Sequence, residues 1–93
     1  MKNLNSVVFP DSLPSLDLHG YDRDYAKLMV KDFINDNIKQ KIETFTIIHG
    51  NGSGILKRAT HDVLRKNSNV LEYKINCFNS GCTIVLIACK KNK

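Results

Sequence analysis

Hydrophobic and polar residues follow two different periods along the chain, and these periods predict where helices and strands lie. Apolar residues return every three or four positions in one segment, which predicts a helix from Arg23 to about Lys39–Lys41. The same period predicts a second helix from about Gly52 or Ser53 to Asn67. Period-two alternation and β-branched runs predict the strands Ser15–Gly20, Thr44–His49, Val70–Phe78 and Thr83–Cys89. The predicted order is therefore β-α-β-α-β-β.

The apolar stripes of the helices indicate which side chains form the core. Asp22 precedes the first helix and is a suitable N-cap. The stripe of the first helix consists of Ala26, Met29, Val30, Phe33, Ile34 and Ile38. The stripe of the second helix consists of Ile55, Leu56, Ala59, Val63 and Leu64. In the third strand, the apolar face consists of Leu71, Tyr73, Ile75 and Cys77. Phe45 is a further predicted core residue.

Crossover rules convert this order into a fold class. Both β-α-β crossovers are expected to be right-handed. If both step the same way across the sheet, both helices lie on one face of it. Asn79, Ser80 and Gly81 predict a turn that joins the last two strands into a hairpin. The strand Thr83–Cys89 is apolar on both faces, so we place it between the second and third strands. The prediction is an α/β protein of the α+β two-layer type, with a four-stranded mixed sheet.

Length and composition describe one small folded domain. The chain has 93 residues, of which 42% are hydrophobic and 25% are charged, and these are ordinary values for a single domain. No apolar run approaches the roughly 20 residues of a membrane span, and the N-terminus lacks the apolar stretch of a signal peptide. We expect a cytoplasmic protein without a membrane partner. It would have an extended arm at residues 1–15, a folded domain at 16–90 and a basic tail at 91–93.

The three cysteines do not form a metal-binding pattern. Cys77, Cys82 and Cys89 have no CxxC spacing, so reduced thiols that serve as small apolar residues are the favoured interpretation. Cys77 and Cys82 flank the predicted turn. A disulfide across the hairpin is therefore the alternative, although it would be unusual in a cytosolic protein.

Positive charge is concentrated in the second half of the chain. The formal net charge is +5, and residues 55–93 hold eight lysines and arginines against two acidic residues. This asymmetry indicates an anionic partner such as nucleic acid. A solvated helix face and a basic tail are the alternative explanation.

Two histidines follow predicted parallel strands directly. Ligands of open α/β sheets bind at the carboxyl ends of the strands, so we expect His19 and His49 to lie near each other at that edge. Asp17 lies two residues before His19 and points to the same side of its strand. We therefore expect the Asp17 carboxylate to orient the His19 imidazole.

The segment HGNGSG, residues 49–54, is a candidate phosphate site. Glycines allow backbone N–H groups to approach an anion closely, and the helix that follows adds its positive end. Lys57 and Arg58 oppose that helix dipole unless an anion lies beside them. The predicted phosphate contacts are Gly50, Asn51, Gly52, Ser53, Gly54, Lys57 and Arg58. The spacing matches neither the dinucleotide fingerprint nor the P-loop, and a tight strand-to-helix turn is the alternative.

The segments LDLHG (residues 16–20) and HGNGSG with ILKR (residues 49–58) resemble the two motifs of the Smr (small MutS-related) domain. The resemblance covers about Leu16 to Lys90 and implies a fold similar to the C-terminal domain of translation initiation factor three. It implies functional positions at Asp17, His19 and His49, at the glycines of the loop and at Lys57. It also implies action on DNA or RNA, with ribosomes or a separate MutS-like ATPase as further partners.

The predicted function is that of an endonuclease that cleaves DNA or RNA. A histidine near neutral pH can act as general acid or base, and Asp17, His19 and His49 are the predicted catalytic residues. They make a thin ligand set for a metal, so the sequence establishes no cofactor and Mg²⁺ assistance stays open. The alternative is a non-catalytic nucleic-acid-binding or ribosome-associated module that uses the same groove. A third interpretation is an interaction domain whose helix-free sheet face pairs with another subunit or with the arm.

Three further side chains receive weaker predictions. His61 lies off the apolar stripe of the second helix, so we expect a solvated surface residue. Tyr21 and Tyr25 flank the first motif. They can stack on bases or cover the start of the first helix.

Overall fold

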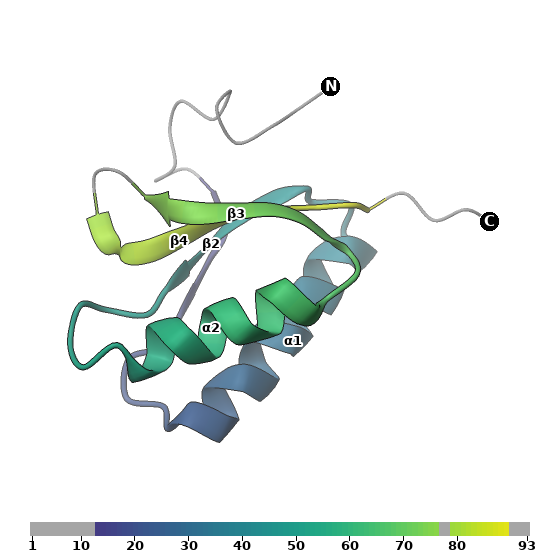
Figure 1. Ribbon diagram of the computed structural model, residues 1–93. Coiled ribbons are helices and arrows are strands. Elements are labelled where there is room, and N and C mark those ends of the chain that lie inside the picture. The colour runs from purple at the N-terminus through teal and green to yellow at the C-terminus, as the bar shows by residue number, and fades with distance from the viewer. Residues whose placement is uncertain (1–12, 77–78, 90–93) are drawn as a thin grey trace.

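The elements follow one another in the predicted order, and the computed structural model describes residues 13–76 and 79–89. They are β1 (Ser15–Asp17), α1 (Arg23–Lys39), β2 (Thr44–Ile48), α2 (Ile55–Lys66), β3 (Val70–Asn76) and β4 (Asn79–Ile87). The sheet order is β1-β2-β4-β3, with β1 parallel to β2 and β4 antiparallel to both neighbours. Both helices cover one face of the sheet (Figure 1). The predicted fold class and the central place of the last strand are confirmed.

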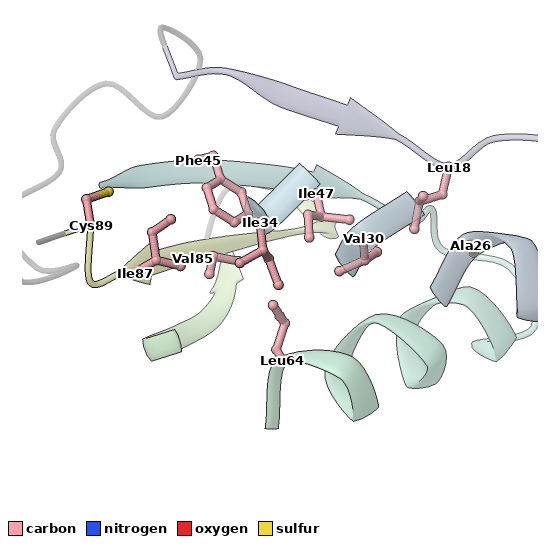
Figure 2. Close-up of a cluster of buried hydrophobic side chains, with 10 residues drawn as sticks. All are labelled: Leu18, Ala26, Val30, Ile34, Phe45, Ile47, Leu64, Val85, Ile87 and Cys89. Atoms are coloured by element: carbon pink, nitrogen blue, oxygen red, sulfur yellow. The ribbon is translucent and has the colours of Figure 1, made fainter. Parts of the chain in front are cut away.

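The core lies between the sheet and the two helices (Figure 2). Its fully or largely buried members are Leu18, Ala26, Val30, Ile34, Phe45, Ile47, Leu64, Val85, Ile87 and Cys89. Ala26, Val30 and Ile34 recur every four residues and so share one face of α1. Phe33 packs edge-on against Phe45, with ring centroids 5.0 Å apart. The predicted stripe of α1 is confirmed, whereas Ile55 at the start of α2 is 48% exposed and was wrongly placed in the core.

The predicted turn at Asn79–Gly81 is wrong, because β4 already begins at Asn79 and pairs with Asn76 of β3. Residues 77 and 78 between them, and with them the Cys77–Cys82 disulfide alternative, lie outside the described residues. Position 81 requires a glycine for a reason other than a turn. A Cβ at this position would lie 3.2 Å from the backbone C and Cα of Gly50. Gly81 therefore permits a close approach of the glycine loop to β4.

The alternation of β3 is interrupted. The pairing of β3 with β4 shifts register between Val70 and Glu72, as at a β-bulge. Val70 and Tyr73 pack against the core, while Leu71 between them is 63% exposed. The prediction that Leu71 shares the apolar face of Tyr73 is therefore wrong, because a bulge changes the face of every residue on one side of it.

The face of the sheet away from the helices also carries buried side chains. Ile84 and Leu86 of β4 are 5% and 6% exposed, and Leu13 packs against them. Leu13 belongs to the predicted arm, of which residues 1–12 lie outside the described residues, as do residues 90–93. A second subunit on this face stays a prediction.

Neither of the two described helices is long and apolar enough to cross a bilayer. The Cys89 thiol is free and buried, and it donates a hydrogen bond to the Ile42 carbonyl at 3.2 Å. Burial raises the pKa of Cys89, and the Glu43 carboxylate adds to this effect. Both effects disfavour the reactive thiolate, so Cys89 behaves as the small apolar residue that was predicted.

Candidate functional site

The two motifs lie side by side at one edge of the sheet. β1 and β2 are parallel, and the Leu18 amide, just beyond β1, donates to the Ile48 carbonyl at the end of β2 at 2.9 Å. The loops that leave these strands therefore start together. They lead to the first turns of α1 and α2 at the same end of the molecule (Figure 1). The predicted proximity of the two motifs holds for their backbones.

Asp17 and His19 form an exposed turn after β1. The Asp17 Oδ1 atom accepts a hydrogen bond from the backbone amide of His19 at 2.9 Å, which is the geometry of an Asx turn. The expected contact was with the imidazole, so the role of Asp17 here is to shape the turn. Leu16 and Leu18 pack on the core, so alternation places Asp17 on the opposite face of β1. The His19 side chain is exposed.

The His49 side chain is buried between β4 and α2 instead of facing the solvent. It is 6% exposed, its Nδ1 lies 3.1 Å from the Gly50 carbonyl oxygen, and its Nε2 lies 2.8 Å from the Thr83 hydroxyl of β4. Both ring nitrogens are thus engaged. Within the described residues, the His19 and His49 rings make no contact. The His49 ring is buried, whereas the His19 ring is exposed.

His61 of α2 belongs to the same cluster, and its predicted place on the solvated surface is wrong. Its Nε2 lies 2.8 Å from the Thr83 hydroxyl, and Thr83 is fully buried. The ring packs at right angles to His49, with centroids 5.9 Å apart, and against Tyr73 at 5.1 Å. One hydroxyl therefore joins a histidine of the glycine motif to a histidine of the following helix.

The hydrogen bonds of this cluster have one consistent direction. The Gly50 carbonyl can only accept, so His49 Nδ1 must carry the hydrogen, and the neutral ring then accepts at Nε2. The Thr83 hydroxyl donates to His49 Nε2 and accepts from His61 Nε2–H. This assignment follows from the network, since hydrogens are inferred from their partners. Protonation of His49 would make Nε2 a donor and leave the buried Thr83 hydrogen without this acceptor.

Both imidazoles of the cluster are neutral at pH 7. Burial lowers the pKa of His49, the hydrogen bond to Gly50 opposes this, and the charge of Lys57 lowers the pKa further. Burial also lowers the pKa of His61, with added repulsion from His49 and Lys57. A buried neutral ring with both nitrogens engaged is suited to holding the loop in place.

The glycine loop is fixed at its start and accessible beyond it. The amides of His49 and Gly50 both donate to the Gly81 carbonyl, at 2.8 and 2.9 Å. Asn51 accepts a hydrogen bond from the Ser80 hydroxyl at 2.7 Å. Residues 50–53 are exposed. Gly50 and Gly54 have left-handed backbone angles, with φ of 81° and 88°, which a residue with a side chain adopts at a cost.

α2 starts two or three residues later than predicted, because the left-handed Gly54 serves as its N-cap. Gly54 offers no side-chain cap, and the first turn contains no acidic residue. Lys57 and Arg58 of this turn are exposed. The start of α2 is thus positive through both its dipole and its side chains.

A cleft of about 660 Å³ lies between the first turn of α1 and the start of α2. Its lining consists of Tyr21, Asp22, Arg23, Asp24, Ser53, Ile55 and Leu56. Tyr21 is partly buried against the core and meets Tyr25 edge-on at 4.9 Å. Tyr25 is 48% exposed. Tyr21 thus helps to cover the start of α1, and base stacking by Tyr25 stays a prediction. The described residues contain no cluster of three or more potential metal ligands.

Comparison with known proteins assigns the family. The model of the Smr domain matches residues 16–88, and the chain therefore belongs to the Smr domain family. Endonuclease MutS2 of Clostridium acetobutylicum is 33% identical over 85 residues, which are 91% of this chain and 10% of that protein. Endonuclease MutS2 of Halothermothrix orenii is 33% identical over 75 residues, or 81% of this chain and 10% of that protein. The chain thus spans about a tenth of the length of these relatives.

Two solved structures share the fold. The Smr domain of Thermus thermophilus MutS2 superimposes with a TM-score of 0.79 at 24% identity, over 82% of this chain and 99% of that chain. YdaL, a stand-alone small MutS-related protein from Escherichia coli, gives a TM-score of 0.74 at 23% identity, over 78% of this chain and 63% of that chain. At these identities the likeness concerns the fold alone.

Proposed function

We propose that this chain binds nucleic acid and cleaves its phosphodiester bonds at the edge where the first motif meets the glycine loop. The observation that carries the proposal is the start of α2. Its N-cap Gly54 has no capping side chain and its first turn has no acidic residue, while the Ser53 hydroxyl accepts from the Ile55 amide at 3.4 Å. Lys57 and Arg58 of this turn are exposed, and its first residues, Ile55 and Leu56, line an open cleft. An arrangement that is poor for helix stability is well suited to an anion. The name endonuclease of the relatives supports the same reaction class.

The residues divide into two groups by their accessibility. Exposed backbone amides of the glycine loop, with Lys57 and Arg58, would hold the phosphate and stabilise the charge that develops in the transition state. His19 is the exposed imidazole next to this loop and would transfer the proton. His19 would accept a proton from a water molecule as the water oxygen bonds to phosphorus. The bond to the leaving oxygen would break, and His19 would pass the proton to that oxygen. Asp17 shapes the turn of His19, and His49 anchors the loop.

A non-catalytic nucleic-acid-binding module is the second candidate, and a specific observation favours it. The Asp17 carboxylate is engaged with a backbone amide and both nitrogens of His49 are engaged, which leaves His19 as the one exposed histidine at this edge. The same surface would then bind a strand or a ribosome without cleaving it. In either case we place the protein in the cytoplasm, and a separate MutS-like ATPase stays a predicted partner.

Cleavage of end-labelled single-stranded RNA, duplex DNA and supercoiled plasmid, with Mg²⁺ and with EDTA, tests the proposal. Wild type, His19→Ala and Asp17→Ala/His19→Ala are compared with Lys31→Ala/Lys39→Ala, which removes exposed side chains of α1 outside the cleft. We expect product from wild type and from the lysine control, and at least about 100-fold less from both histidine variants. Equal products from all four proteins would rule out the site. Retained binding without product from any of them would establish the second candidate.

A further inference from the structure

A second hollow, of about 450 Å³, lies between α1 and α2. Arg23 and Lys27 line it from α1, and Arg58, His61, Asp62 and Arg65 line it from α2. The two helices run next to each other on the same face of the sheet (Figure 1). We refer to this hollow as the interhelical groove. Lys27 and Asp62 join its two walls with an ion pair of 3.0 Å.

The groove has an excess of positive charge. Its lining contains four cationic side chains and one carboxylate. That carboxylate, Asp62, is already engaged by Lys27 at 3.0 Å, Arg65 at 2.7 Å and Lys66 at 3.3 Å. The hydrogen bond from Lys27, with that from Lys66, lowers the pKa of Asp62, although burial opposes them. One ionised carboxylate therefore faces four cations, and an added anion would improve the balance.

The ion pairs do not explain why the groove has so many arginines. Among the ion pairs of the groove in the described part of the chain, Lys27–Asp62 is the pair that bridges the two walls. Arg65 pairs with Asp62 within α2. Arg23 pairs with its neighbour Asp24 at 3.4 Å, with both side chains at least 67% exposed. Exposed pairs of this kind contribute about 0–1 kcal/mol, so their arginines are available to a ligand at little cost.

The groove continues the cleft at the glycine loop. Arg23 and Ile55 line both hollows, so the two share a wall. Arg58 and Arg65 lie seven residues, and thus about 10 Å, apart along α2. This distance corresponds to about three nucleotide steps of a stacked strand. His61 lines the groove and is tied through Thr83 to His49 at the start of the loop.

We propose that the interhelical groove binds the backbone of a single-stranded segment of the substrate, with Arg23 and Arg65 contacting phosphates beyond the one held at the glycine loop. The inference rests on the proposed function, because it extends that phosphate site. A hollow of about 450 Å³ has the size of a small-ligand pocket. This is room for part of the backbone of one strand, and on this basis single strands are the preferred substrate class.

Salt-dependent binding tests the groove separately from cleavage. The affinity for a labelled 12-nucleotide single strand is measured by fluorescence anisotropy at several salt concentrations. Arg23→Gln/Arg65→Gln removes one arginine from each wall, and Lys31→Gln/Lys39→Gln removes the same charge from exposed positions of α1 outside the groove. We expect the groove variant to bind about tenfold more weakly at low salt, with a salt slope smaller by about 1.4, or about 0.7 for each lost phosphate contact. The control variant keeps the wild-type slope.

Two outcomes would overturn the inference. The first is a salt slope of the groove variant equal to that of the control. The second is a duplex of the same length binding as tightly as the single strand. If wild type binds no nucleic acid, the proposed function fails together with the groove. If Arg23→Gln/Arg65→Gln weakens binding but wild type cleaves nothing, the groove is supported and only the nuclease activity fails. Thermal unfolding of each variant confirms that the fold is intact.

Discussion

The first turns of α1 and α2 lie at the same end of the molecule, yet their chemistry is opposite. Asp22 caps α1 by accepting a hydrogen bond from the Tyr25 amide at 2.8 Å, and Asp24 adds a negative charge in the first turn. α2 starts at a glycine without a side-chain cap, and Lys57 and Arg58 follow. The start of α1 has a capping carboxylate and an added negative charge. The start of α2 has a Ser53 hydroxyl on the Ile55 amide at 3.4 Å and an uncompensated positive charge.

α2 is anchored in a different way from α1. His61, one helical turn beyond Lys57, is tied through the Thr83 hydroxyl to His49, and the amides of His49 and Gly50 bind the Gly81 carbonyl. The start of α2 and its loop are thereby fixed from the side of β4. A loop fixed from behind can keep its front open, which is what a rigid anion site requires.

The largest expected effect breaks this anchor. Thr83→Val removes the hydroxyl that bonds both imidazoles and leaves the buried Nε2 of His49 without its partner. We expect the free energy of unfolding to fall by about 2 kcal/mol, as measured by urea denaturation. Thr83→Ser keeps the hydroxyl and is the matched control. Identical unfolding curves for the two variants would show that the hydroxyl does not anchor the cluster.

Reversing the charge at the start of α2 separates stability from binding. Lys57→Glu places a carboxylate at the positive helix end, which should raise the free energy of unfolding by about 0.3–1 kcal/mol. It should also lower the affinity for a single-stranded oligonucleotide by about tenfold, or about 1.4 kcal/mol. Lys31→Glu makes the same charge change at an exposed position in the middle of α1. Equal losses of affinity in both variants would mean that only net charge matters.

Removing the cap of α1 gives the opposite result. Asp22→Ala leaves the Tyr25 amide without its hydrogen bond, so the free energy of unfolding should fall by about 1 kcal/mol. The affinity for the oligonucleotide should not fall, because the change removes a negative charge from the lining of the cleft. Asp22→Ser restores an N-cap and should restore most of the stability. A loss of affinity without a loss of stability would contradict the comparison.

The smallest expected effect is a dependence of stability on pH. Burial lowers the pKa of His49 and His61 below the ordinary value of 6.5 in the folded state. The unfolded chain therefore binds more protons than the folded one as the pH falls below 6.5, and stability decreases in that window. The stability that the two neutral rings contribute is fully present above pH 6.5. It is lost as the pH falls from 6.5 through the lowered pKa values of the folded state. Lys57, Tyr73 and Thr83 are the charged and polar neighbours of the two rings.

Urea denaturation between pH 5 and 7.5 measures this effect. His61→Gln is the control, because an amide N–H can still donate to the Thr83 hydroxyl without titrating. Its stability should vary less with pH than that of wild type. The lowered pKa of Asp62 acts below its ordinary value of 3.8, outside this range. A pH dependence of His61→Gln as steep as that of wild type would contradict the assignment of His61 to the cluster.

The bounds of α1 and the strand order were predictable, because they follow from residues within each element. The start of α1 follows from its cap, and its end at Lys39 falls in the predicted range. The central place of β4 follows from apolar residues on both faces. Gly81 led to a wrong prediction, because a glycine beside Asn79 and Ser80 is typical of a turn. In the structure, a glycine is needed there because the backbone of Gly50, 31 residues earlier, lies so close.

The site was predictable only in part, because its decisive contacts join distant segments. His61 lies off the apolar stripe of α2, and its partner Thr83 comes 22 residues later. The spacing of hydrophobic and polar residues along the chain does not predict a contact over this distance. Arg23 and Arg65 also lie far apart along the chain, and they line one groove only because α1 packs against α2. The glycines and the histidine beside them were predictable, since they are contiguous.

The two edges of the sheet have a consequence for how the protein behaves when crowded. One edge strand, β1, has three residues, and the other, β3, shifts register at both Val70/Glu72 and Ile75/Asn76. Short and bulged edges resist the addition of a further strand. At high local concentration, copies of the chain should therefore resist joining edge to edge through their sheets.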